Sequence, residues 1–203
     1  MSYLITALVF GISLLDGPFL SGSLHWDIAN AFGLLAFALL LYLFVDVGLT
    51  NRSRLHQHLS YAMALLTCAH ILWIWVPDPI IWTYLALDAP WYMQAGMASV
   101  GLILVSLLLA LPATRRHWHG SYRKFRSLHL WLATASLIAA TGHILGSGLY
   151  FSKVESVLFV LATALVAVLG KLNRLPRPRL TYLQALGLML FPAGFVLLKL
   201  PYS

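Results

Sequence analysis

Seven apolar stretches of about twenty residues follow one another along the chain, and charged or turn-forming residues separate each from the next. A helix needs about 20 apolar residues to cross the hydrocarbon core of a bilayer, so each stretch has the length of a membrane span. The stretches are residues 3–20, 27–48, 56–76, 92–111, 127–147, 154–171 and 180–199. The sequence therefore predicts an all-α integral membrane protein with six or seven transmembrane helices, organised as one transmembrane domain over residues 1–203.

Composition supports the membrane assignment. Charged residues make up only 9% of the chain and hydrophobic residues 61%, whereas a soluble domain carries about 25% charged residues. The first stretch ends in Asp16-Gly17-Pro18, which leaves open whether it spans fully. It has no basic segment before it and no clear cleavage site, so we interpret it as a retained membrane segment.

A single cysteine, Cys68, excludes a disulfide within the chain and a thiolate metal cluster.

The charged residues alternate between the two ends of the spans. Eleven of the thirteen Lys and Arg residues follow the second, fourth and sixth stretches, and five of the six acids lie at the opposite ends. Cytoplasmic loops of membrane proteins carry an excess of Lys and Arg, so we predict that the basic loops are cytoplasmic, in a bacterial inner membrane. The same rule explains the net charge of +7. We therefore expect a lipid environment and no nucleic-acid partner.

Four of the eight histidines repeat one spacing. His56 and His70 lie 14 residues apart in the third stretch, and His129 and His143 lie 14 apart in the fifth. Fourteen residues turn a helix by about 1,400°, only ~40° short of four full turns, and advance it by roughly 21 Å. The two histidines of each stretch thus share one face at two depths. Ionisable residues inside a membrane are expensive, which makes each a candidate functional residue.

The two histidine pairs lie at matching depths. The third and fifth stretches are separated by one span and therefore run parallel, so His56 is level with His129 near the cytoplasm and His70 is level with His143 near the outer face. Two facing histidines supply the axial ligands of a heme iron. The sequence predicts two b-type hemes within a core of about residues 27–171. The absence of a Cys-x-x-Cys-His motif excludes covalent heme but leaves the non-covalent subtype open.

Other interpretations of these histidines stay open. His58 is the rival to His56, although it lies about 120° from His70 around the helix. An intramembrane histidine can also be a hydrogen-bond partner between helices, or belong to a non-redox transporter. Zinc fits less well, because neither depth offers a third or fourth ligand.

Two segments resemble the ferric reductase-like transmembrane domain family, which includes ferric reductases, NADPH oxidases and the heme subunit of the bacterial methionine sulfoxide reductase system. One is Arg54-Leu55-His56 with the apolar helix that ends Cys68-Ala69-His70. The other is YRKFRSLH, residues 122–129, with the helix that ends Thr141-Gly142-His143. The resemblance covers about spans two to six. It implies that the axial ligands of two heme b groups are His56, His70, His129 and His143.

The resemblance also implies a function and its partners. Complete enzymes of the family carry a flavin and nicotinamide module, which this sequence lacks, so we expect a stand-alone heme subunit of an oxidoreductase. Electrons would enter from a cytosolic flavoprotein reductase or a quinol. They would leave at the outer face to a redox protein, a quinone, ferric ion or oxygen. The alternative is a membrane cytochrome b anchor of a larger dehydrogenase or hydrogenase that exchanges electrons with quinone.

Basic and aromatic residues flank the histidines. Arg54, Arg123 and Arg126 lie nearest the inner histidines and are candidate partners of heme propionates. The loop over residues 115–126 either docks an acidic flavoprotein or only anchors the topology. At the outer ends, tryptophans and tyrosines cluster around Asp78 and Asp88. They form either an interfacial aromatic belt or a pocket over the outer heme.

Overall fold

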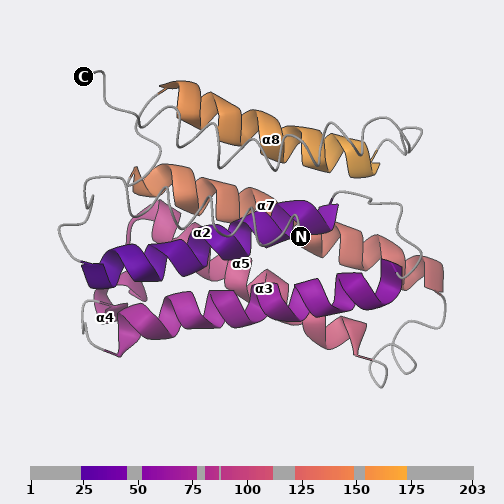
Figure 1. The fold of residues 1–203 in the computed structure, drawn as a ribbon, viewed down its shortest axis with the longest axis horizontal. Coiled ribbons are helices and arrows are strands. Elements are labelled where there is room, and N and C mark those ends of the chain that lie inside the picture. The colour runs from indigo at the N-terminus through magenta and orange to yellow at the C-terminus, as the bar shows by residue number, and fades with distance from the viewer. Residues whose placement is uncertain are drawn as a thin grey trace. The chain divides into compact units, whose positions relative to one another are not determined.

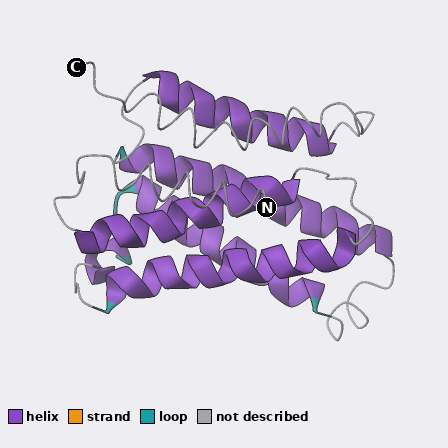
Figure 2. Cartoon of the chain, in the orientation of Figure 1, coloured by secondary structure: helices purple, strands orange, loops and turns teal. Residues whose placement is uncertain are grey.

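A computed structural model describes residues 24–44, 52–76, 81–86, 88–111, 122–148 and 154–172. Figures 1 and 2 show that the regular structure within these ranges is helical, with no strand. The predicted spans 3–20 and 180–199 lie outside the described residues. The all-α prediction is therefore confirmed for the described part of the chain.

Five described helices coincide with the five central predicted spans. They are α2 (Leu24–Phe44), α3 (Arg52–Trp75), α5 (Trp91–Ala110), α7 (Tyr122–Ser147) and α8 (Val154–Leu172). A single helical turn, α4 (Ile81–Tyr84), was not predicted. Its four residues are too few to give a periodic hydrophobic pattern, so hydropathy could not reveal it.

Four of these helices are long and apolar enough to cross a membrane. The spanning segments are His25–Phe44, Arg54–Trp75, Trp91–Ala110 and Lys124–Ser147. A shorter apolar run, Val160–Leu169, lies in α8. Large apolar side chains such as Leu65, Trp131 and Leu158 are exposed. Lipid accepts such side chains without cost, whereas water does not, so these features indicate an integral membrane protein.

Helices α3 and α7 begin earlier than the apolar stretches predicted. α3 begins at Arg52 rather than residue 56, and α7 begins at Tyr122 rather than residue 127. A helix satisfies its own backbone hydrogen bonds, so it continues from the hydrocarbon core into the headgroup region. Basic side chains at these ends extend toward water. Hydropathy therefore marks the apolar part of each helix and misses its basic first turn.

The described helices fall into two compact units. The first unit contains α2, α3 and α8, and the second contains α4, α5 and α7. Within the first unit, α2 and α3 lie side by side and run in opposite directions (Figure 1). Within the second unit, α5 and α7 pack against each other along their length. Each unit is thus built on one helical hairpin.

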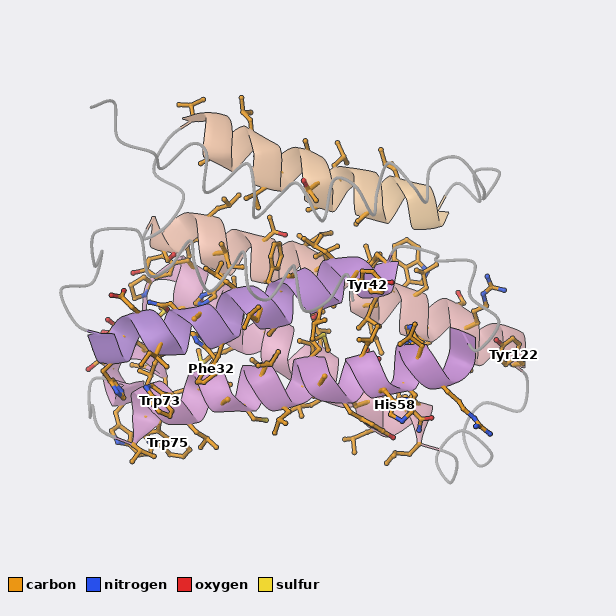
Figure 3. The ribbon with its side chains drawn as sticks, in the orientation of Figure 1. Phe32, Tyr42, His58, Trp73, Trp75 and Tyr122 are labelled. Atoms are coloured by element: carbon orange, nitrogen blue, oxygen red, sulfur yellow. The ribbon has the colours of Figure 1, made fainter. Side chains whose placement is uncertain are left out.

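The α2–α3 hairpin has small residues in its centre and aromatic rings at one end. Ala29 and Ala36 are buried seven residues apart on α2, and small residues let two helix backbones approach closely. At one end of the interface, Trp73 of α3 stacks on His25 with ring centroids 5.7 Å apart. The same indole meets the edge of Phe32 at 5.8 Å, between the two helices in Figure 3.

The α5–α7 hairpin is held by hydroxyls and by close backbone approach. The hydroxyl of Ser99 donates to the Ser136 carbonyl oxygen at 3.1 Å, and the Ser136 hydroxyl donates to the Ser99 carbonyl oxygen at 3.3 Å. Gly146 lies so close to α5 that a Cβ atom there would be 2.5 Å from the Cβ of Tyr92. The register of the two helices is therefore fixed at its middle and at one end.

Candidate metal centre

The imidazole of His70 is oriented by the backbone of α2. Its Nδ1 lies 2.7 Å from the carbonyl oxygen of Ala29. A carbonyl oxygen only accepts hydrogen bonds, so Nδ1 must carry the proton and donate it. In the neutral ring the lone pair is then on Nε2, which is the nitrogen that can bind a metal.

A glycine makes room for this ring. Gly33 lies one helical turn after Ala29, and a Cβ atom there would be only 3.1 Å from Nδ1 of His70. Few Cβ contacts are that short. The absence of a side chain at Gly33 thus lets the imidazole lie flat against α2 and reach the carbonyl.

His143 is held in the same way within the second unit. Its Nδ1 donates to the carbonyl oxygen of Tyr92 in α5, at 2.9 Å. Gly96, one turn after Tyr92, faces the ring, and a Cβ atom there would be 2.8 Å from Nδ1. The carbonyl and the glycine again come from the preceding, antiparallel helix.

These two arrangements make the hairpins copies of one motif. The motif is a carbonyl at one position, a glycine four residues later, and a histidine of the next long helix that contacts both. Ala29 and Gly33 precede Tyr92 and Gly96 by 63 residues each, and His56 and His70 precede His129 and His143 by 73 residues each. Sequence reasoning found only the histidine spacing. A backbone carbonyl leaves no residue signature, and the two glycines are recognisable only once the helix register is known.

His56 lies on the same face of α3 as His70. Met63, which is buried, is seven residues from each of them, and positions seven apart share one helical face. His58 instead follows the stripe of Leu65 and Leu72, which are 71% and 50% exposed. In Figure 3 His58 projects from the side of α3 that points away from α2. The side chain of His56 is itself exposed, but its helical position matches that of His70.

His129 occupies the corresponding place on α7. It lies seven residues before Ser136 and fourteen before His143, on the face that packs against α5. Phe125, one turn earlier, stacks on its ring with centroids 5.5 Å apart and an interplanar angle of 20°. The aromatic contact restricts the orientation of the imidazole.

The candidate propionate partners lie at the basic ends of the same helices. Arg54 and Arg126 are exposed within one turn of His56 and His129, respectively. Arg123 also belongs to α7, but its side chain lies outside the described residues. Most of the basic loop over residues 115–126 precedes the described part of α7. The arginines are therefore near the inner histidines in sequence, and the helices extend far enough to carry them.

The aromatic residues at the other end of the spans are largely exposed. Trp73, Trp75, Trp82 and Trp91 each expose two fifths or more of their surface. Asp27, by contrast, is buried in the first turn of α2. Exposed indoles near the ends of membrane helices are typical of the aromatic belt of a membrane interface. Asp78 lies outside the described residues.

The four histidines are divided between the two units. His56 and His70 belong to the first, and His129 and His143 belong to the second. The pairing of His56 with His129 and of His70 with His143 therefore stays a prediction. Within the described ranges, no group of three or more His, Cys, Asp or Glu residues could hold a metal ion. Axial heme ligation requires only two protein ligands, and a histidine with its Nδ1 proton fixed by a carbonyl is suited to that role.

Comparison of the chain with family models, with curated proteins and with solved structures gives no match.

Proposed function

We propose that the chain is a diheme membrane cytochrome of the ferric reductase-like type, which carries electrons across the bilayer. The observation that supports this most strongly is the shared arrangement of His70 and His143. In each, a backbone carbonyl fixes the Nδ1 proton and a glycine accommodates the ring. Metal-ligating histidines almost always donate their second N–H in this manner, which orients the ring and makes the other nitrogen more basic.

The repeated hairpin suggests how the histidines would meet. The helices that carry the histidines, α3 and α7, are separated by one predicted span and would therefore run parallel across the bilayer. Equivalent histidines of the two helices would then lie at the same depth of the membrane. His70 would then face His143, and His56 would face His129. Under this proposal each pair supplies the two axial ligands of one heme b.

The heme irons would supply the one-electron chemistry, and the chain would supply the frame. The four imidazoles would ligate the heme irons, and the apolar helices would exclude water from them. Arg54, Arg123 and Arg126 are the proposed partners of the inner propionates, because guanidinium groups bind carboxylates with two parallel hydrogen bonds. The two ligand levels are separated by roughly 21 Å along each helix. Electrons would pass from the inner level to the outer one.

The proposed direction follows from charge. With the basic ends in the cytoplasm of a bacterium, the donor is a cytosolic flavoprotein reductase or a quinol. The acceptor at the outer face is a redox protein, a quinone, ferric ion or oxygen. An anchor subunit of a larger dehydrogenase is the second candidate, and it would exchange electrons with quinone. Reduction of the purified protein by a flavin reductase, compared with reduction by a quinol, distinguishes the two.

The spectrum of the purified protein tests the proposal. Reduced-minus-oxidised spectra in detergent should show b-type bands, and the pyridine hemochrome assay should give two hemes per chain. A colourless protein, after expression with sufficient heme supply, would refute the proposal. The His143→Ala variant should retain one heme, because only the outer level loses a ligand. The same content of heme as in the wild type would refute the ligand assignment.

A further inference from the structure

We infer that the hydroxyl of Ser106 in α5 positions the imidazole of His129 by accepting a hydrogen bond from its Nδ1. The inference rests on the proposed function, since it assigns a positioning residue to one inner heme ligand. It concerns α5 and α7 only, which belong to one unit.

The register of α5 against α7 brings the two residues together. At one end of the interface, the Tyr92 carbonyl oxygen accepts from His143 at 2.9 Å. Seven residues further along α5, the hydroxyl oxygen of Ser99 lies 3.1 Å from that of Ser136. Ser136 in turn lies seven residues before His143. Seven residues are close to two helical turns, or about 10.5 Å, on both helices. The next step of the same register pairs Ser106 with His129.

The hydroxyl of Ser106 is buried and available to accept a hydrogen bond. Ser106 is only 8% exposed, and its Oγ atom is buried without a hydrogen-bond partner among the residues that the structure describes. Serine and threonine in helices commonly donate to the carbonyl four residues earlier, as Thr141 does to Leu137 at 2.8 Å. Ser106 does not use this option. A buried hydroxyl without a partner is costly, so a ring N–H at the same level is the partner that would stabilise it.

The contact would complete the pattern seen at the outer level. There, each imidazole donates from Nδ1 to a carbonyl oxygen of the preceding helix. At the inner level, Ser106 offers a hydroxyl oxygen as acceptor, and its O–H can then donate a hydrogen bond to the carbonyl oxygen of Leu102, four residues earlier. The corresponding position in the α2–α3 hairpin, 63 residues earlier, is Leu43, which has no polar atom on its side chain. The two inner ligands would therefore differ, and only His129 would have its basicity raised by a hydroxyl.

The test compares three variants of the full chain, each purified with its hemes. Ser106→Ala should keep two hemes, raise the midpoint potential of one, and shift one low-spin ferric signal in electron paramagnetic resonance. The potential should rise because a less basic ligand stabilises ferric iron less well. Ser106→Thr keeps the hydroxyl, so its midpoint potentials and ferric resonance signals should match those of the wild type. Gly101→Ala changes another position of α5, where an added Cβ atom meets nothing within 4 Å, and should leave both hemes unchanged.

The outcomes separate this inference from the proposed function. A wild-type protein without heme would refute the function itself. Two hemes with unchanged potentials and resonance signals in Ser106→Ala would overturn the inference and leave the function standing. If Ser106→Ala loses a heme that Ser106→Thr retains, the hydroxyl is required and the inference is supported. If both variants lose it, only side-chain volume matters and the inference is overturned. Repeating Ser106→Ala in the His143→Ala background shows that the affected heme is the inner one.

Discussion

Gly96 lies directly against the imidazole of His143, so that a Cβ atom at Gly96 would come within 2.8 Å of Nδ1. Real Cβ atoms essentially never approach another heavy atom that closely. A side chain of any size at this position must therefore displace the ring from the Tyr92 carbonyl oxygen.

We predict that Gly96→Ala impairs the outer heme. The methyl group pushes the imidazole away and breaks its hydrogen bond at 2.9 Å to Tyr92. The variant should lose one of the two hemes or bind it with an altered spectrum, as measured by pyridine hemochrome and by difference spectroscopy. Misplacing a metal ligand through its outer partners typically costs 10–100-fold in metal affinity.

The matched control for this variant is Gly101→Ala. Gly101 lies in the same helix, five residues later, and a Cβ atom there meets nothing within 4 Å. Alanine forms helices better than glycine by about 1 kcal/mol, so this variant should be as stable as the wild type or slightly more stable. Equal heme loss in both variants would contradict the steric explanation.

Gly33→Ala should have a milder effect on the same measurement. A Cβ atom at Gly33 would be 3.1 Å from Nδ1 of His70, which a shift of a few tenths of an ångström relieves. The imidazole can then stay within hydrogen-bond distance of Ala29. We expect two hemes with a small spectral shift, and a larger defect than in Gly96→Ala would contradict the order of the two distances.

Gly146→Ala should destabilise the α5–α7 hairpin. A Cβ atom there would lie 2.5 Å from the Cβ of Tyr92 and 2.8 Å from the Trp91 ring. The Cβ of Tyr92 is bonded to the α5 backbone, so the contact can be relieved only if the two helices move apart. Overpacking of this kind typically costs 1–3 kcal/mol. Thermal denaturation in detergent should show a lower midpoint for Gly146→Ala. Gly142→Ala is the control, since its new methyl would make an ordinary 3.5 Å contact with Trp91. Equal midpoints for both variants would contradict the prediction.

The sequence predicted the central helices well because hydropathy over twenty residues is a strong signal. It predicted the shared face of each histidine pair because helix periodicity needs only residue numbers. It did not predict the role of Gly33 or Gly96. Both stand in apolar runs where glycine has many explanations, and only the register between antiparallel helices shows what each one faces. The single turn α4 and the basic first turns of α3 and α7 were missed, because apolar length was the only criterion.

The choice between His56 and His58 can be decided by a pair of substitutions. His56 shares a helical face with Met63 and His70, whereas His58 shares one with exposed Leu65 and Leu72. We therefore expect His56→Ala to lose the inner heme and keep the outer one, which leaves one heme per chain by pyridine hemochrome. His58→Ala should keep both hemes, because its face of α3 points away from α2. Loss of a heme in His58→Ala but not in His56→Ala would reverse the assignment. Loss in both would show that His58 also supports the inner site, for instance through a propionate, and a redox titration would then show whether the remaining heme keeps its potential.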